Sequence, residues 1–270
     1  VTPAALCQNV QRLAQLARPA YEDLIGELRR AAVVHADETG WRIGTLNAWL
    51  WVFTNQQATV YLVRSGEGAR GHEAVVEILG ERFRGVLVSD CFSAYDVDKF
   101  AQWLKQKCFS HLLKDPDEMR EAGKAVSAAF LTETTACPKK AVELKKSKPN
   151  LPEQDYRRRC EQTENRLDHI LEAYAEIPEP DAARFIARLT RRRAHLFTFL
   201  YHDAVPPTNN HAERMIRPAV IARKTQGCNK SAAGAQAHAI LGSILVSEKQ
   251  QGRSPVARLA DLIRERASPN

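Results

Sequence analysis

The sequence predicts an α/β fold: a mixed β-sheet with flanking helices and a large all-helical insertion. Short runs rich in valine and aromatic residues occur between positions 32 and 113, where a helical pattern separates two groups of them. From about position 112 to 204 the strand signals stop, and helical spacing dominates. Because the α/β pattern resumes with a helix at about 208, an insertion into one domain fits better than two independent domains.

The elements predicted for the first part of the chain support this fold class. Residues 3–30 carry apolar side chains at steps of three and four, which predicts two amphipathic helices separated at Pro19. Three strands are expected at 32–38, 47–54 and 58–64, antiparallel and with a turn at Asn-Gln-Gln between the last two. A helix at 71–83 and a strand at 84–90 follow, and a further strand runs into a helix within 106–113.

The rest of the chain is expected to be helical. Helical patterns at 118–133, 153–177 and 181–202 build the insertion, and helices at about 208, at 231–252 and at 254–266 follow it. The predicted organisation is an N-terminal helical segment (1–32), an α/β domain in two parts (33–111 and 206–252), the insertion (112–205) and a C-terminal helix (253–270). The small residues of 231–252 predict close packing on the sheet.

Composition narrows the class only modestly. The chain has 270 residues, 44% hydrophobic content and a formal net charge of +7, which is compatible with a nucleic-acid partner without requiring one. None of the six cysteines forms a Cys-x-x-Cys pair, so no structural zinc site is expected. Their scatter through the chain predicts reduced intracellular thiols rather than a disulfide framework. No apolar run of membrane-spanning length and no signal peptide is recognised. Because the sequence begins at Val1 and not at Met, we expect an upstream part to be missing.

Three carboxylates stand at predicted element ends. Asp37 closes the first strand, Asp90 ends the strand at 84–90, and Glu213 lies one turn into the helix near 208. Side chains at the ends of adjacent strands can converge, and a packed helix can supply a third. Carboxylate oxygens are the ligands that Mg²⁺ prefers, and paired metal ions about 3.5–4 Å apart serve phosphodiester chemistry.

Each carboxylate also has a purely structural interpretation. Asp37 can be a solvated strand end, and Asp90 can cap the helix that follows. Glu213 lies three residues after Asn210, close to a capping-box arrangement. Local spacing leaves these interpretations open.

The order of four motifs is more specific than any of them alone. "HADETGW" (35–41), "GVLVSDCFSAYD" (85–96), "CFSHLLKD" (108–115) and "PPTNNHAERMIRP" (206–218) occur in this sequence. Together with "RKTQGCNKSAAGAQAHAILGSIL" (223–245), they resemble bacterial insertion-sequence transposases with an Asp-Asp-Glu triad, in particular the insertion-sequence-sixty-six group. The resemblance covers most of the chain, from about residue 33 to 252.

The resemblance implies a ribonuclease-H-like fold whose triad is Asp37, Asp90 and Glu213. It implies two Mg²⁺ ions, for which Mn²⁺ substitutes, with Asp37 bridging both. Water would attack the phosphodiester at the transposon end, and the freed 3′-hydroxyl would attack the target DNA. The implied partners are transposon-end and target DNA, further copies of the chain assembled on DNA, and accessory proteins of the same element. The implied location is the bacterial cytoplasm at the nucleoid, without membrane contact.

Two departures from the group stand out. Its members usually carry upstream zinc-binding and helix-turn-helix elements, which are absent here and leave site-specific binding of transposon ends by this chain alone in question. Cys91 and Phe92 occupy positions where a small residue and an aromatic residue are expected.

Basic residues around the third carboxylate are predicted to contact DNA phosphates. The alternative is a solvated basic face or salt bridges to the insertion. The basic stretch 139–159 also has two interpretations: it binds flanking DNA, or it forms a mobile solvated loop. His111 either lies near the active site or is an ordinary buried histidine. The predicted DNA-binding residues are Arg214, Arg217, Arg223, Lys224 and Lys230.

Two other functions share these features. A ribonuclease-H-like nuclease would use the same triad without strand transfer. A non-catalytic DNA-binding remnant of a decayed element would need no triad, so the presence of all three acids argues against it.

Overall fold

A computed structural model describes residues 2–122 and 126–267 of the chain. It contains two compact units. The first consists of the described residues in Val1–Leu87, Phe92–Trp103 and Asn210–Asn270, and the second of those in Val88–Cys91 and Leu104–Asn209. Within the described ranges, no helix is both long enough and apolar enough to cross a membrane.

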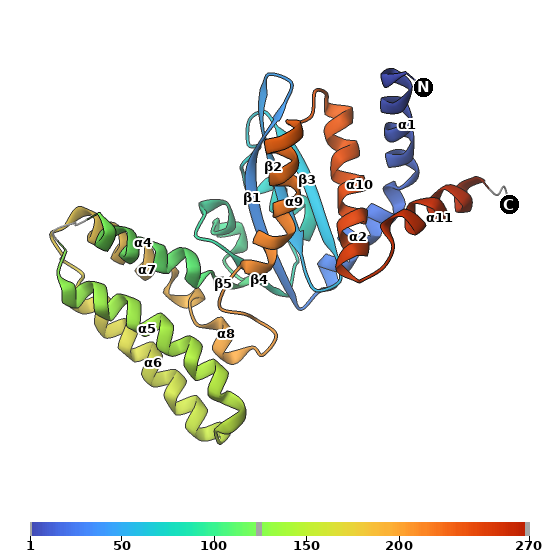
Figure 1. The fold of residues 1–270 in the computed structure, drawn as a ribbon. Coiled ribbons are helices and arrows are strands. Elements are labelled where there is room, and N and C mark those ends of the chain that lie inside the picture. The colour runs from blue at the N-terminus through green and yellow to red at the C-terminus, as the bar shows by residue number, and fades with distance from the viewer. Residues whose placement is uncertain (1, 123–125, 268–270) are drawn as a thin grey trace. The chain divides into compact units, whose positions relative to one another are not determined.

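An antiparallel meander forms the centre of the first unit (Figure 1). Its strands are β1 (Val33–Ile43), β2 (Leu46–Thr54) and β3 (Thr59–Ser65), in the order and orientation that the sequence predicts. β1 is longer than expected, because pairing with β2 continues to Ile43 opposite Leu46. Gly44 supplies the positive φ of +58° in the intervening turn.

The complete sheet has five strands in the order β3-β2-β1-β4-β5. β4 (Val86–Ser89) and β5 (Leu104–Lys107) are shorter than the meander strands, and β4 is the neighbour of β1. α3 (Glu73–Leu79) precedes β4, and 3₁₀ turns at Ser93–Tyr95 and Asp98–Phe100 follow it. The predicted α/β class, a mixed sheet with flanking helices, is confirmed.

Helices cover both faces of the meander. α1 (Pro3–Leu16), α2 (Arg18–Arg30) and α3 bury apolar side chains with the odd-numbered residues of β2, such as Trp51 and Phe53. α9 (Asn210–Gln226) packs on the opposite face, where Ala212 and Ile216 meet Leu50 and Val52. This alternation along β2 is the period-two pattern of a strand buried on both sides.

α10 (Ala232–Gln250) covers the edge strand β3, and α11 (Pro255–Ala267) follows it. Ser243 Oγ accepts a hydrogen bond from Tyr61 N–H at 2.7 Å, and Ser247 Oγ accepts one from Thr59 N–H at 2.9 Å. A Cβ on Gly242 would come within 3.0 Å of the Tyr61 ring. The small residues of α10 therefore allow the close approach that the sequence predicts, and its hydroxyls satisfy donors of the sheet edge.

The second unit is dominated by helices. They are α4 (Phe109–Glu121), α5 (Ala128–Ser147), α6 (Glu153–Ala173), α7 (Pro180–Arg192) and α8 (Thr198–Tyr201), with 3₁₀ turns at Lys148–Asn150 and Arg193–His195. The single helix predicted at 118–133 is wrong, since α4 ends at Glu121 and α5 begins at Ala128; residues 123–125 lie outside the described ranges. The basic stretch 139–159 is not a loop, because α5 and α6 contain most of it.

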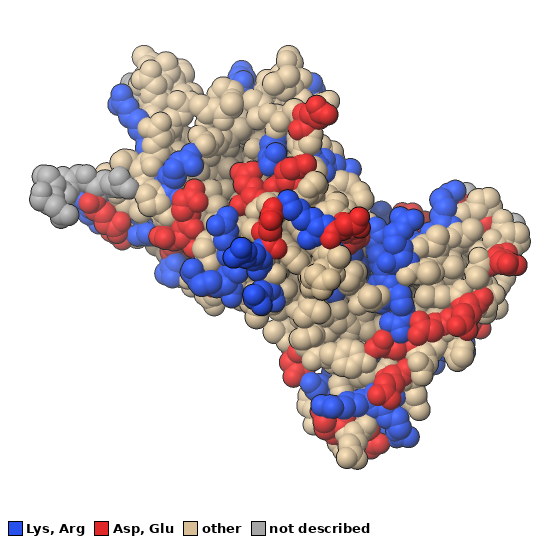
Figure 2. Space-filling view, turned by 180° about the vertical axis from the view of Figure 1, so that it is seen from behind, with Lys and Arg blue, Asp and Glu red and all other residues tan. Residues whose placement is uncertain are grey.

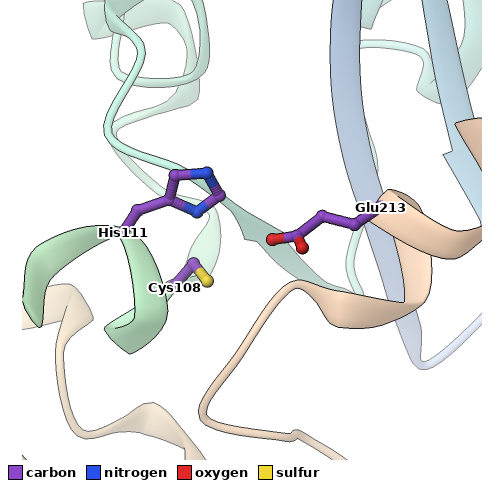
Figure 3. A group of neighbouring side chains, drawn as sticks. All are labelled: Cys108, His111 and Glu213. Atoms are coloured by element: carbon purple, nitrogen blue, oxygen red, sulfur yellow. The ribbon is translucent and has the colours of Figure 1, made fainter. Parts of the chain in front are cut away.

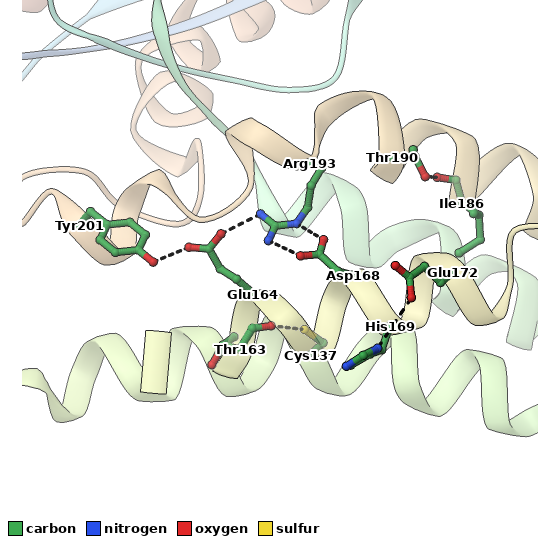
Figure 4. A network of polar contacts seen from close by, with 10 residues as sticks. All are labelled: Cys137, Thr163, Glu164, Asp168, His169, Glu172, Ile186, Thr190, Arg193 and Tyr201. Carbon is green, nitrogen blue, oxygen red and sulfur yellow. Dashed lines mark hydrogen bonds and ion pairs between the residues drawn. The ribbon is translucent and has the colours of Figure 1, made fainter. Parts of the chain in front are cut away.

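A network of partly buried ion pairs joins α6 to the segment after α7 (Figure 4). The Arg193 guanidinium donates to both Asp168 oxygens, at 2.5 and 2.9 Å, and to Glu164 Oε2 at 2.9 Å. Tyr201 OH donates to the other Glu164 oxygen. These bonds hold the pKa of Asp168 below its ordinary value, chiefly through the hydrogen bond from Arg193.

Candidate active site

β1 presents two adjacent acids to opposite sides of the sheet. Asp37 lies opposite Val52, which belongs to the apolar cluster beneath α9. Because side chains alternate along a strand, Asp37 shares the α9 side with His35 and Thr39, while Glu38 faces the other way. Asp37 is half-buried, and its Oδ1 accepts a hydrogen bond from Glu38 N–H at 2.9 Å.

Glu38 has a structural role. Only 2% of its side chain is exposed, and its carboxylate accepts hydrogen bonds from Arg70 and from Tyr95 OH, both at 2.8 Å. The Arg70 guanidinium also lies 4.0 Å from the ring centroids of Trp49 and Phe92. The Glu38 carboxylate is thus paired on the side of the sheet away from α9, whereas Asp37 lies on the side that carries α9.

α9 crosses β1 on this side, and two contacts fix the crossing. The His35 and His211 rings lie 5.2 Å apart. Twelve residues further along α9, Arg223 donates to Thr39 Oγ1 at 2.9 Å and to Gly40 O. Asp37 lies between these contacts on β1, and Glu213 lies between them on α9. The first unit thus brings together the segments that carry the first and third predicted acids.

Glu213 occupies the first turn of α9 (Figure 3). The helix begins at Asn210, as the two asparagines predict, and Glu213 is half-buried. The preceding His211 is held in place by its Nε2, which lies 2.7 Å from Asn55 O. Burial is the main reason why the pKa of His211 is lowered, so its ring is neutral near pH 7.

Asp90 follows the last residue of β4, the strand beside β1. Two buried cations in the second unit bind the backbone of the segment that follows β4. Lys107 Nζ donates to Ser89 Oγ at 3.2 Å and to Asp90 O at 3.1 Å, and Arg192 donates to Cys91 O at 2.6 Å. The sequence did not single out either cation, because both are far from Asp90 along the chain.

His111 lies in the first turn of α4, in the second unit, together with Cys108 (Figure 3). Burial by itself raises the pKa of the Cys108 thiol, but hydrogen bonds from His111 and from Asn209 N–H outweigh it and lower that pKa. Sequence reasoning missed Cys108. Its three-residue spacing from His111 at a helix start was the available signal.

The predicted DNA-binding residues differ in exposure. Arg214, Arg217, Lys224 and Lys230 are exposed, whereas Arg223 is half-buried against β1. On the face shown in Figure 2, a group of basic side chains is bordered by acidic ones. Both signs share that face, so net charge alone does not assign a DNA-binding surface.

The prediction that Asp37 closes the first strand is wrong, because pairing with β2 continues to Ile43 and places Asp37 within β1; Asp90 directly follows β4, as predicted. The class of the protein is shown by a family match. The chain belongs to the transposase IS66 family, whose model matches residues 1–237. Among solved structures, the catalytic domain of Mos1 mariner transposase is similar to it with a TM-score of 0.24 and 14% identity, over 76% of this chain and 97% of that chain. That similarity is too low to inform the site. No curated protein sequence matches the chain.

Proposed function

We propose that the chain is the catalytic core of a DNA transposase and that Asp37, Asp90 and Glu213 are its Asp-Asp-Glu triad. The observation that supports the proposal is the crossing of α9 over β1, because the strand carries Asp37 and the helix carries Glu213. The IS66 family match over residues 1–237 supports the class of reaction.

The residues fit a divalent metal. Asp37 and Glu213 are half-buried carboxylates that offer hard oxygen ligands, as Mg²⁺ prefers, and Mn²⁺ accepts the same donors. The neighbouring Glu38 is committed to Arg70 and Tyr95 and does not compete for this role. Bound Mg²⁺ would neutralise charge that develops on the reacting phosphate.

The proposed reaction has two steps, both of which conserve atoms and charge. In the first, water oxygen bonds to the phosphorus at the transposon end, and the P–O3′ bond breaks, so that O3′ takes a proton and becomes a free hydroxyl. In the second, that hydroxyl loses its proton as its oxygen bonds to a target phosphorus, and the target 3′-oxygen leaves and takes up a proton. One phosphodiester forms for each that breaks, so this step needs no external energy source.

The wider setting follows from the family and is part of the proposal. The exposed cations of α9 would contact DNA phosphates, and several copies would assemble on paired ends. Accessory proteins of the element would act with them in the bacterial cytoplasm.

A joining assay tests the proposal against its nearest alternative. Labelled transposon-end DNA and an unlabelled target plasmid are incubated with the protein and Mg²⁺, and products are separated by size. A transposase yields label joined to the target, whereas a nuclease yields cut ends alone. Asp90→Ala should abolish both products, and Mg²⁺-dependent cleavage by this variant would refute the triad.

A further inference from the structure

A groove of about 960 Å³ lies in the first unit, between the β1–β2 turn and the connection from α9 to α10. Two hydrogen bonds to Asn229 build it: Gly44 N–H donates to Asn229 O at 2.8 Å, and Trp41 Nε1–H donates to Asn229 Oδ1 at 2.8 Å. The first of them belongs to a parallel β-bridge between Ile43 and Asn229. We call this site the hairpin groove. Its two walls are tied together at Asn229, so its shape is set by the fold.

Most of the surface that lines the hairpin groove is apolar, and the charged side chains in it are all cations. Arg42, Arg223 and Lys230 line it, and no aspartate or glutamate does. Across residues 2–122 and 126–267, none of these cations forms an ion pair with a carboxylate, since the bonds of Arg42 and Arg223 go to uncharged oxygens. Their charge is therefore available to an anionic ligand. The amide side chains of Asn47, Gln226 and Asn229 add uncharged donors and acceptors.

The groove lies a short, defined distance from Asp37. Gly40 lines it and is three residues along β1 from Asp37. At about 3.3 Å per strand residue, this separation is about 10 Å. A DNA strand advances about 3.4 Å for each nucleotide, so about three nucleotides span it.

We infer that the hairpin groove binds the sugar–phosphate backbone of a DNA strand, about three nucleotides from the phosphate that reacts. Arg42 and Lys230 contact phosphates, and the amides contact sugars or base edges. Arg223 adds positive charge from a fixed position, because its guanidinium already donates to Thr39 and Gly40. The placement of the reacting phosphate rests on the proposed function, whereas DNA binding by the groove does not.

The first experiment measures DNA binding without chemistry. The full chain is titrated into a fluorescent 30-base-pair duplex in EDTA at several salt concentrations. Arg42→Gln/Lys230→Gln is compared with Arg12→Gln/Arg82→Gln, which removes two exposed charges outside the groove. The groove variant should bind at least tenfold more weakly, and its slope of log K against log salt should be smaller by about 1.8. Equal effects of the two variants, with unchanged melting temperatures, would overturn the inference.

Two further readouts define the ligand and its position. Polyglutamate should compete poorly with DNA for the wild type, and equal competition would show that the groove accepts any polyanion, which contradicts a DNA site. A photo-crosslinking residue at the exposed Asn47 should label DNA within two to four nucleotides of the cleaved position. Labelling more than eight nucleotides away would contradict the placement. If the wild type fails to cleave, the proposed function fails, while the binding result in EDTA still stands.

Discussion

The imidazole rings of His35 and His211 lie 5.2 Å apart where α9 crosses β1. Each histidine precedes a predicted catalytic acid by two residues, Asp37 on the strand and Glu213 on the helix. On β1 a two-residue step returns to the same face, so the contact fixes which side Asp37 faces. This pair of rings links two segments that are 176 positions apart in the sequence, as the numbers of the histidines show.

Glu38→Gln separates structure from chemistry at β1. The substitution removes the charge that pairs with Arg70 and that accepts the Tyr95 hydroxyl. We expect the free energy of unfolding to fall by about 1–3 kcal/mol in urea denaturation. Cleavage by the folded variant at low temperature should stay within threefold of wild type. A loss of cleavage as large as that of Asp37→Asn, without a loss of stability, would show that the two roles are misassigned.

Arg193→Ala tests the network of the second unit. The change removes three hydrogen bonds to Asp168 and Glu164 and leaves the two carboxylates close to each other. We expect a loss of about 1–3 kcal/mol in the free energy of unfolding. Arg191→Ala, at an exposed position of α7, is the matched control and should change it by less than about 0.5 kcal/mol. Equal losses in the free energy of unfolding for Arg193→Ala and Arg191→Ala would mean that the network does not stabilise the second unit.

The pH dependence of stability should report on His238. Burial against Trp41, whose ring lies 5.2 Å away, lowers the pKa of this histidine in the folded chain. As the pH falls below about 6.5, His238 becomes protonated in the unfolded chain but stays neutral in the folded chain. The free energy of unfolding therefore falls, by at most about 1.4 kcal/mol per pH unit. His238→Gln should make the loss between pH 7.5 and 5.5 smaller. His169→Gln, exposed on α6, should not, and equal slopes for both variants would contradict the assignment.

Gly44→Ala tests the shape of the hairpin groove. Gly44 has φ +58°, and an added Cβ would lie 3.3 Å from Lys230 O. Gly66→Ala, at φ +86° with open space around it, is the control for backbone strain alone. Both changes should cost about 1–2 kcal/mol in the free energy of unfolding. Only Gly44→Ala should weaken DNA binding, and an equal effect of both on affinity would argue against the groove.

The sequence predicted most of the elements, because their signals are local. β-branched and aromatic runs predicted β2 and β3 closely, and Pro19 fell within the first turn of α2. The end of β1 was missed because Gly40 and the charged Arg42 weaken the strand pattern, and pairing with β2 carries the strand through them. The break between α4 and α5 was missed because helical spacing continues on both sides of it.

The candidate site was predicted only in part, because tertiary contacts define the rest. Motif order led to the prediction of Asp37, Asp90 and Glu213, which stays a prediction, whereas local spacing left each open to a structural interpretation. The clamp of Lys107 and Arg192 on the chain after β4 could not be predicted, since it joins residues from separate elements. The hairpin groove was missed for the same reason: Arg42 and Lys230 line one groove because Ile43 pairs with Asn229.

The central claim is that Asp37 and Glu213 belong to one catalytic site. Its most direct test is the single-turnover rate of Mg²⁺-dependent cleavage, measured for Asp37→Asn, for Glu213→Gln and for the double variant. DNA binding in EDTA shows that each variant is folded, and Glu38→Gln is the control for an adjacent acid. If the carboxylates act as one metal site, each single variant should lose at least about a thousandfold in rate, and the combination should lose little more than either alone. Cleavage within tenfold of wild type in either single variant, or independent multiplicative losses in the combination, would contradict a shared catalytic site.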